Sequence, residues 1–270
     1  MERSSTPDKW HDGDAYEHYM GRWSRQVAPR FLQWLDEAPA RRWLDVGCGT
    51  GALSAAILAH CAPRSVTGAD PSEGFLAAAE RRLGTHVVLH CAAAGALPLP
   101  DDHVDVAVSG LVLNFVPDAP AALREMVRVT TQGGRVAAYV WDYAQRMDLI
   151  RIYWSAAVQV DPQNVQGQDQ GERFALCHPE ALAAAFAGAG LRDVEVSAIE
   201  IPMHFADFDD YWQPFLAGQG PAPAHAAGLQ EDVRNRLRDL IRARIPMQPD
   251  GSIRLAARAW AARGGVVKGC

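Results

Sequence analysis

Three glycines at alternate positions stand where an expected buried strand turns into an expected helix. Residues 43–46 are apolar apart from Asp45, which suits a buried strand, and the apolar residues of 52–60 recur with helical spacing. The turn between them contains Gly47, Gly49 and Gly51. Because glycine lacks Cβ, the backbone N–H groups of this turn and of the helix N-terminus can come close to a ligand. The spacing predicts a site for an anion or a polar, nucleotide-like molecule.

A carboxylate, Asp70, follows the next expected strand, residues 65–69. Dinucleotide-binding proteins have the fingerprint G-x-G-x-x-G and an acid roughly 20 residues further on that binds a ribose hydroxyl. Asp70 lies at about that distance, but the glycines here are spaced G-x-G-x-G. The sequence therefore keeps the ribose-binding acid and alters the pyrophosphate-binding turn. An NAD(P)-type oxidoreductase, which needs this fingerprint or a close variant of it, remains an alternative.

Three motifs together resemble one enzyme family. Residues 44–51 (LDVGCGTG) resemble the first motif of the class I S-adenosylmethionine-dependent methyltransferases, and residues 70–72 (DPS) resemble the second. Residues 97–105 (LPLPDDHVD) resemble the LPF-x-D-x-x-F-D stretch of the ubiquinone/menaquinone C-methyltransferase-like branch, methyltransferase type 11. The resemblance covers about residues 40 to 140. It implies a Rossmann-like α/β fold, with a doubly wound seven-stranded sheet whose last strand is antiparallel, and methyl transfer to a small molecule.

The same resemblance implies S-adenosyl-L-methionine as the cofactor. Asp45 and the glycine turn are expected to face its amino-acid end, and Asp70 can accept from both ribose hydroxyls because a carboxylate offers several acceptor positions. The family usually has an adenine-binding acid where this chain has Ala93, which leaves only backbone groups near Ala93 and Ala94. A non-catalytic, regulatory cofactor-binding protein is therefore a second alternative. The expected cofactor-binding residues are Tyr19, Arg22, Asp45, Gly47, Cys48, Gly49, Gly51, Asp70, Pro71, Ala93, Ala94, Ser109 and Gly110.

Residues 1–40 are expected to form a helical lid over the cofactor cleft, as the resemblance implies. Apolar residues between positions 14 and 35 recur every three or four residues, which indicates helix, and Pro29 is expected to split it. Tyr16, Tyr19 and Arg22 then project from the first part. The alternative is an ordinary amphipathic helix with a tyrosine in the core.

Polar residues that follow the expected fourth and fifth strands are the candidates for catalysis. Asn114 lies in the loop after residues 104–109, and Trp141, Asp142 and Tyr143 follow residues 135–140. Ligands bind at the carboxyl ends of parallel strands. Methyl transfer from a sulfonium depends mainly on alignment, and a general base is needed only if the acceptor loses a proton. The expected catalytic residues are Asn114, Asp142 and Tyr143, with His178 a weaker candidate for a base.

The acceptor is expected to bind between the lid and two insertions, residues 144–178 and 207–250, that form a substrate cap. These segments are rich in aromatic residues, which suits a small and partly planar or apolar molecule. The alternative is that the rings pack the insertions against the sheet. The expected substrate-binding residues are Tyr16, Asn114, Trp141, Tyr143, Arg173 and Trp212. The methylated atom, N, O, S or C, stays open.

Composition limits the class of protein. A chain of 270 residues, 49% hydrophobic and 21% charged, fits one globular α/β domain over residues 1–270, with residues 41–143 as the cofactor-binding core. A net charge of −6 argues against a nucleic-acid partner. Five cysteines without C-x-x-C or metal-ligand spacing suggest reduced thiols and no metal, and no apolar run is long enough for a membrane span. We expect a cytoplasmic monomer or homodimer.

Overall fold

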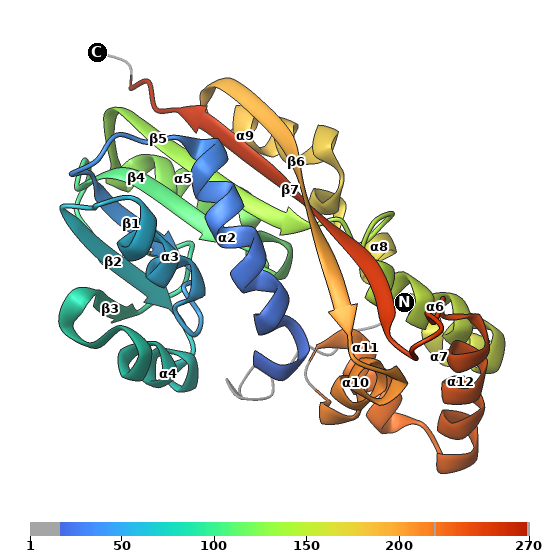
Figure 1. Ribbon diagram of the computed structural model, residues 1–270. Coiled ribbons are helices and arrows are strands. Elements are labelled where there is room, and N and C mark those ends of the chain that lie inside the picture. The colour runs from blue at the N-terminus through green and yellow to red at the C-terminus, as the bar shows by residue number, and fades with distance from the viewer. Residues whose placement is uncertain (1–16, 219, 269–270) are drawn as a thin grey trace.

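The computed structural model describes residues 17–218 and 220–268, and a seven-stranded sheet forms its centre (Figure 1). The strands are β1 (Arg42–Val46), β2 (Ser65–Asp70), β3 (Val88–Cys91), β4 (Val104–Gly110), β5 (Thr130–Trp141), β6 (Arg192–Phe205) and β7 (Ile253–Gly265). Their spatial order is β3-β2-β1-β4-β5-β7-β6. Strands β1 to β5 pair in parallel, and β7 is antiparallel to both β5 and β6. The expected Rossmann-like sheet with an antiparallel last strand is confirmed.

Helices cover both faces of this sheet. They are α2 (Arg22–Leu35), α3 (Ala52–His60), α4 (Glu73–Leu83), α5 (Ala119–Val129) and α9 (Pro179–Gly188). Alternate residues of the central strands face two separate cores: Trp43 and Val106 pack with α2 and α3, whereas Leu44 and Ala107 pack with α5 and α9. A parallel strand that is covered on both faces is apolar almost throughout, which is why these strands are recognisable in the sequence.

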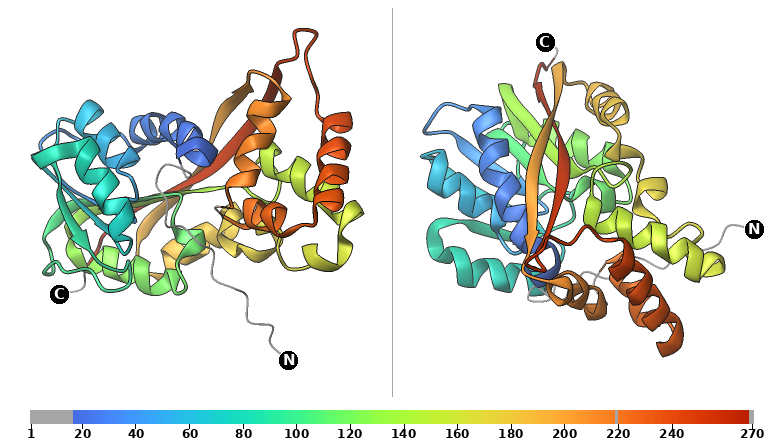
Figure 2. Two further views of the ribbon diagram at one scale, coloured as in Figure 1. Left: turned by 90° about the horizontal axis from the view of Figure 1, so that it is seen from below. Right: turned by 45° about the vertical axis from the view of Figure 1, so that its right-hand side comes forward.

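A second group of helices lies beyond the ends of β6 and β7, which extend past the other strands (Figures 1 and 2). This group, called the cap helices below, comprises α6 (Asp148–Val160), α7 (Pro162–Val165), α10 (Phe208–Trp212), α11 (Pro221–Gly228) and α12 (Glu231–Arg244). Helices α11 and α12 both contact α6, so the segments on either side of β6 in the sequence come together. In Figure 2 the cap helices stand beside the α/β core and not over its middle.

Shorter elements complete the described chain. They are the π-helical turn η1 (Glu17–Gly21), the 3-10 turns η2 (Gly84–His86), η3 (Leu113–Phe115), η4 (Ala175–Cys177) and η5 (Gln213–Ala217), and the short helix α8 (Gln170–Arg173). Within residues 17–218 and 220–268, no helix combines the length and apolar character that crossing a membrane requires.

The expected break at Pro29 is wrong, because α2 continues through it to Leu35. A proline inside a helix costs about 3 kcal/mol. The neighbouring side chains of Val27, Ala28 and Phe31 are fully buried against the sheet, and their burial offsets that cost.

Candidate functional site

A cavity of about 470 Å³ lies at the carboxyl ends of the parallel strands. Its lining comes from the glycine turn after β1, the segments that follow β2, β3, β4 and β5, and the start of α2. Small-molecule sites usually measure about 300–1,000 Å³. The cavity therefore has the size and the position expected of a ligand site in an open α/β sheet.

Asp45 is the charged residue most deeply buried in the cavity wall, with 1% of its surface exposed. Its Oδ2 accepts a hydrogen bond of 2.7 Å from the Ser54 hydroxyl on α3. Its Oδ1 is buried and has no hydrogen-bond partner among the described residues. Burial raises the pKa of this carboxyl to about 7. Since an unsatisfied buried oxygen is costly, a donor or cation in the cavity would be bound favourably there.

The glycine turn has the left-handed backbone that only glycine adopts readily, with φ of 72° at Gly47, 53° at Gly49 and 82° at Gly51. A Cβ on Gly47 would lie 2.5 Å from Val112, so this glycine permits the loop after β4 to approach. No atom lies within 4 Å of the Cβ position of Gly49, which faces the cavity. Gly51 does not line the cavity. A Cβ at this position would meet Leu83, so this glycine lets α4 pack closely against the turn.

Asp70 joins the end of β2 to the glycine turn. Its Oδ2 accepts from the N–H of Gly49 at 3.0 Å, and its Oδ1 accepts from the N–H of Ser72 at 2.8 Å. Burial raises the pKa of Asp70, while these two hydrogen bonds favour the charged form. Each oxygen retains a second acceptor position. Cys48 and Pro71, also expected at the cofactor, line the cavity beside it.

The wall that follows β3 consists of small residues. Ala93, Ala94 and Gly95 line the cavity, and backbone groups are the polar atoms that they offer. Asp118 lines the cavity nearby and caps α5, where its Oδ1 accepts from the N–H of Ala121 at 2.8 Å. Asp118 is not among the residues that the sequence predicts at the site. Among the described residues, the charged side chains of the lining are Asp45, Asp70 and Asp118, which favours a cationic ligand.

Of the three expected residues at the end of β5, two face the cavity and one points away from it. Trp141 and Tyr143 are buried and line the cavity. Asp142 does not line it: its carboxylate accepts from Arg258 of β7 at 2.6 Å and from the N–H of Gln145 at 2.8 Å. The expectation that Asp142 lies beside the reacting atoms is contradicted, because successive residues of a strand point to opposite faces.

The residues expected after β4 are also divided. Gly110 lines the cavity, whereas the Ser109 hydroxyl donates to the carbonyl oxygen of Val46 at 2.8 Å and ties β4 to β1. Asn114 is in η3 and is half-buried, but it is not part of the lining; its Oδ1 has no hydrogen-bond partner among the described residues. Phe115, its neighbour, does line the cavity.

The N-terminal segment contributes different residues from those expected. Met20 and Ser24 line the cavity, but Tyr19 and Arg22 do not. Arg22 forms an ion pair of 2.8 Å with Asp210, and its guanidinium lies 4.4 Å from the ring centre of the adjacent tryptophan. Helical spacing alone did not reveal which side chains of this segment face the cavity. Tyr16 lies outside the described residues.

The remaining expected acceptor residues lie away from the cavity. Arg173 stacks over Phe174 at 5.1 Å, and Trp212 is buried with its ring centre 5.9 Å from that of Phe215. In the described part of the chain, no residue after Tyr143 lines the cavity, so the insertions do not roof it directly. Across the same residues, no cluster of three or more His, Cys, Asp and Glu has the arrangement of a metal site.

The sequence and the fold both match known proteins. A family model described as "Methyltransferase domain" matches residues 44–138. Over 121 residues the chain is 35% identical to 2-phytyl-1,4-naphtoquinone methyltransferase of Synechococcus elongatus, an overlap of 43% of this chain and 50% of that protein. The YcgJ protein from Bacillus subtilis superposes with a TM-score of 0.58 and 18% identity, covering 90% of this chain and 100% of that one.

One relative is matched well beyond the core. A malonyl-(acyl-carrier protein) O-methyltransferase of Geobacter sulfurreducens is 30% identical over 201 residues, which are 73% of each chain. The chain spans about half the length, or less, of the curated relatives that it matches over the core alone. The match to the Geobacter protein reaches past β5, and the family model begins on β1 and includes the glycine turn and Asp70. On this extent of similarity, the chain belongs to the class I S-adenosylmethionine-dependent methyltransferases.

Proposed function

We propose that this protein binds S-adenosyl-L-methionine and transfers its methyl group to a small-molecule acceptor. The observation that carries the proposal is the unpaired Oδ1 of Asp45 in the wall of a cavity whose charged lining is acidic. The cofactor has a sulfonium and an α-ammonium group, and both are cations. A cavity that holds carboxylates beside a glycine turn suits such a molecule better than it suits the anionic pyrophosphate of a dinucleotide.

Successive parts of the cavity wall fit the amino-acid end, the ribose and the adenine of the cofactor. Asp45 and the turn at Gly47 and Gly49 would hold the amino-acid end, where the absence of Cβ lets the backbone approach. Asp70 would accept from the ribose hydroxyls with its two remaining acceptor positions. Backbone groups at Ala93 and Ala94 would contact the adenine. When bound, the cofactor supplies an electrophilic methyl group on sulfur.

The chain's own contribution to the transfer is positioning and exclusion of water. Trp141 and Tyr143 line the cavity with large, rigid rings that can fix a partly planar acceptor. Of the three residues expected to act in catalysis, Tyr143 is the one that reaches the cavity. If the acceptor must lose a proton, the Tyr143 hydroxyl is in place to orient it.

We further propose that residues 1–270 act as one domain, with residues 41–143 binding the cofactor. Residues 144–178 and 207–250 then form a cap that stabilises the acceptor-binding side of the cavity without lining it. The contacts of α6 with α11 and α12 support a common unit for these two segments.

Calorimetric titration with S-adenosylmethionine, S-adenosylhomocysteine and NAD tests the cofactor assignment. We expect the first two to bind and NAD not to compete. Gly49→Val should abolish binding by placing a side chain in the cavity. Gly133→Val is the matched control, because Gly133 also has a positive φ of 75° and open space around its Cβ position but does not line the cavity. Binding that survives Gly49→Val, or NAD as the tighter ligand, would overturn the assignment.

A turnover assay distinguishes an enzyme from a regulatory protein that binds the cofactor without catalysing transfer. Incubation of the protein with labelled S-adenosylmethionine and a metabolite extract should yield a labelled small molecule. Tight binding without any labelled product across several extracts would favour a cofactor-binding protein that does not catalyse transfer.

A further inference from the structure

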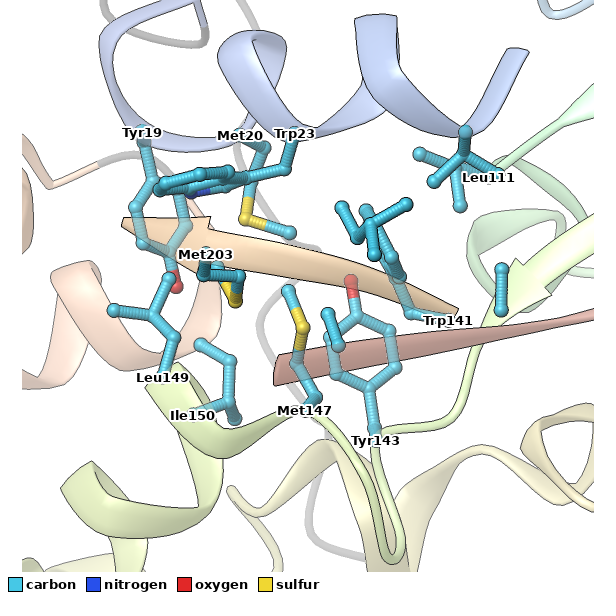
Figure 3. Packing of buried hydrophobic residues seen from close by; sticks show 14 of the residues in the cluster. Tyr19, Met20, Trp23, Leu111, Trp141, Tyr143, Met147, Leu149, Ile150 and Met203 are labelled. Carbon is cyan, nitrogen blue, oxygen red and sulfur yellow. The ribbon is translucent and has the colours of Figure 1, made fainter. Parts of the chain in front are cut away.

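The walls of the cavity continue into two different cores. Tyr143 belongs to the hydrophobic cluster shown in Figure 3, which packs with α2 and α3. Ala94 and Val116 also line the cavity, but they pack against the other core, on the face that α5 covers. Residues 93–95 and 116–118 therefore form a separate part of the lining, called the α5 wall below.

Helix α5 holds the two segments of the α5 wall together. The Cβ atom of Ala121, on the first turn of this helix, lies 3.8 Å from the position that a Cβ on Gly95 would take. Further along the helix, Glu125 accepts from the N–H of Leu97 at 3.0 Å. The backbone that follows β3 is thus fixed beside the N-terminus of α5, where Asp118 is the capping residue.

The α5 wall offers hydrogen-bond donors on one segment and an acceptor on the other. The N–H groups of Ala93 and Ala94 have no hydrogen-bond partner among the described residues, whereas the Ala93 carbonyl oxygen accepts from the N–H of Ala96 at 3.0 Å. Asp118 caps α5 with Oδ1, which accepts from the N–H of Ala121 at 2.8 Å, and no described residue donates to its Oδ2. A ligand edge with an acceptor beside a donor would satisfy both segments.

The cavity is marked as a ligand site independently of Asp118. Asp45 is 1% exposed, and its Oδ1 in the cavity wall has no partner among the described residues. The carboxylate of Asp70 already accepts from the N–H groups of Gly49 and Ser72 with its two oxygens. Asp118 is therefore the carboxylate of the lining that has one oxygen without a described partner at the α5 wall.

We propose that Asp118 recognises the nucleobase of the cofactor: its Oδ2 accepts a hydrogen bond from the 6-amino group of adenine, while the N–H groups of Ala93 and Ala94 donate to the adjacent ring nitrogen. This inference rests on the proposed binding of S-adenosyl-L-methionine and adds the residue that selects adenine. Hypoxanthine has an oxygen at position 6 and a proton on the adjacent nitrogen, so both contacts would bring like groups together. A site that hydrogen-bonds a ligand group disfavours an analogue without it, because the polar atoms of the site are left unpaired.

The test compares three ligands by calorimetric titration into the full-length protein: S-adenosylhomocysteine, its analogue with unsubstituted purine, and its analogue with hypoxanthine. The purine analogue keeps the ring nitrogens and lacks the 6-amino group, so it isolates the contact with Asp118. It should bind about tenfold more weakly than S-adenosylhomocysteine, the ratio expected for one hydrogen bond to a charged group. The hypoxanthine analogue should bind most weakly of the three.

The capping bond predicts the effect of Asp118→Asn. The amide oxygen of asparagine can replace Oδ1 and accept from the N–H of Ala121, since asparagine is a good N-cap. The amide NH₂ group then takes the place of Oδ2 and donates where the carboxylate accepts. S-adenosylhomocysteine should lose its advantage over the purine analogue, and the hypoxanthine analogue should gain about tenfold relative to S-adenosylhomocysteine. Asp118→Ser keeps a cap but is too short for the contact, so S-adenosylhomocysteine and the purine analogue should bind equally.

Two further variants are controls. Asp207→Asn changes another helix cap, one that accepts from the N–H of Asp210 at 2.9 Å and does not line the cavity. It should keep the affinity order of the wild type. Asp70→Ala should weaken all three ligands by a similar factor, because the ribose is the same in each.

Each other outcome has a distinct meaning. If the wild type binds S-adenosylhomocysteine and the purine analogue equally, or if Asp118→Asn and Asp118→Ser keep the wild-type preference, the assignment of Asp118 is wrong and the cofactor assignment stands. If Asp118→Asn binds none of the ligands, the ratio measured in Asp118→Ser decides. If the wild type binds none of the three, the proposed function is wrong and the assignment of Asp118 falls with it.

Discussion

The Asp45 carboxylate accepts a hydrogen bond of 2.7 Å from the Ser54 hydroxyl, and its other oxygen is left unpaired beside the cavity. The helix α3 thus holds the carboxylate of β1 in one orientation while leaving it incompletely satisfied. Burial raises its pKa to about 7, so near neutral pH the group is close to half ionised. A cationic ligand and the charge on Asp45 are therefore coupled.

Binding of S-adenosylmethionine should release a proton from Asp45 below neutral pH. Since the cation selects the ionised carboxylate, affinity should be about tenfold lower at pH 6 than at pH 8. Calorimetry in two buffers of different ionisation enthalpy at pH 6.5 measures the proton release. Asp45→Asn is the comparison, because it keeps the shape of the side chain and cannot titrate. Equal proton release in both proteins would assign the proton to the ligand and not to Asp45.

The same group should make the unliganded protein less stable as pH rises. Its folded pKa of about 7 lies above the ordinary value of 3.8, so its contribution is present below pH 4 and is lost between about pH 4 and pH 7. The shift sets an upper limit of about 4 kcal/mol. We expect Asp45→Asn to melt at a higher temperature than the wild type at pH 8 and at a similar temperature at pH 4. The same difference at both pH values would contradict this.

Asp70→Ala should weaken cofactor binding in two ways. It removes the acceptor for the ribose hydroxyls, and it frees the N–H of Gly49 that Asp70 holds at 3.0 Å. The loss expected for hydrogen bonds to a charged group is about 1.5–3 kcal/mol. Titration with S-adenosylhomocysteine measures it. Asp118→Ala should lose less affinity and more stability of α5, because its carboxylate caps that helix.

Asp142→Asn should reduce stability more than catalysis. The Asp142 side chain is 2% exposed and pairs with Arg258, which is 18% exposed. Breaking such a pair leaves a buried charge without a partner and costs about 3–5 kcal/mol. Urea unfolding of Asp142→Asn, Arg258→Gln and the double variant gives the coupling energy. A large fall in kcat with unchanged unfolding would instead give Asp142 the catalytic role that its position argues against.

The sequence predicts those parts of the fold whose signal is local. Strands β1 to β5 and the glycine turn follow from apolar runs, glycine spacing and motifs, and each is present in the structure, although β5 begins at Thr130 and not at the expected residue 135. Asp142 shows where this reasoning failed: three neighbours at a strand end were treated as one cluster, although strand alternation separates the middle one from the others.

The part that could not be predicted depends on contacts between distant segments. The helical spacing around Tyr19 and Met20 does not distinguish an α-helix from the π-helical turn η1, which decides which side chain reaches the cavity. Apolar residues at helical spacing predict α6 and α12 but not the shorter cap helices α7, α10 and α11. The position of the cap helices beside the core depends on how far β6 and β7 extend, and their sequences carry no local signal of that length.

Acid should destabilise the cap helices through a buried chain of polar groups that joins three of them. The Tyr153 hydroxyl of α6 lies 2.6 Å from Nδ1 of His225 on α11, and Nε2 of His225 lies 3.4 Å from Asp161, between α6 and α7. Burial lowers the pKa of His225, and the neighbouring Asp161 opposes that effect only in part. Because the folded pKa lies below the ordinary value of 6.5, the unfolded chain takes up the proton first, and stability falls as pH drops below about 6.5. Above that pH His225 is neutral in both the folded and the unfolded chain, so it does not make the free energy of unfolding depend on pH.

Hydrogen exchange followed by mass spectrometry should show faster exchange in α6 and α11 at pH 5.5 than at pH 7.5, after correction for the intrinsic rates. Tyr153→Phe, which removes one hydrogen bond, should cost about 0.5–1.5 kcal/mol at pH 7.5 and keep the pH dependence, whereas His225→Gln should remove the pH dependence of these helices. Exchange in α6 that follows pH in the same way in His225→Gln would show that another group controls the cap.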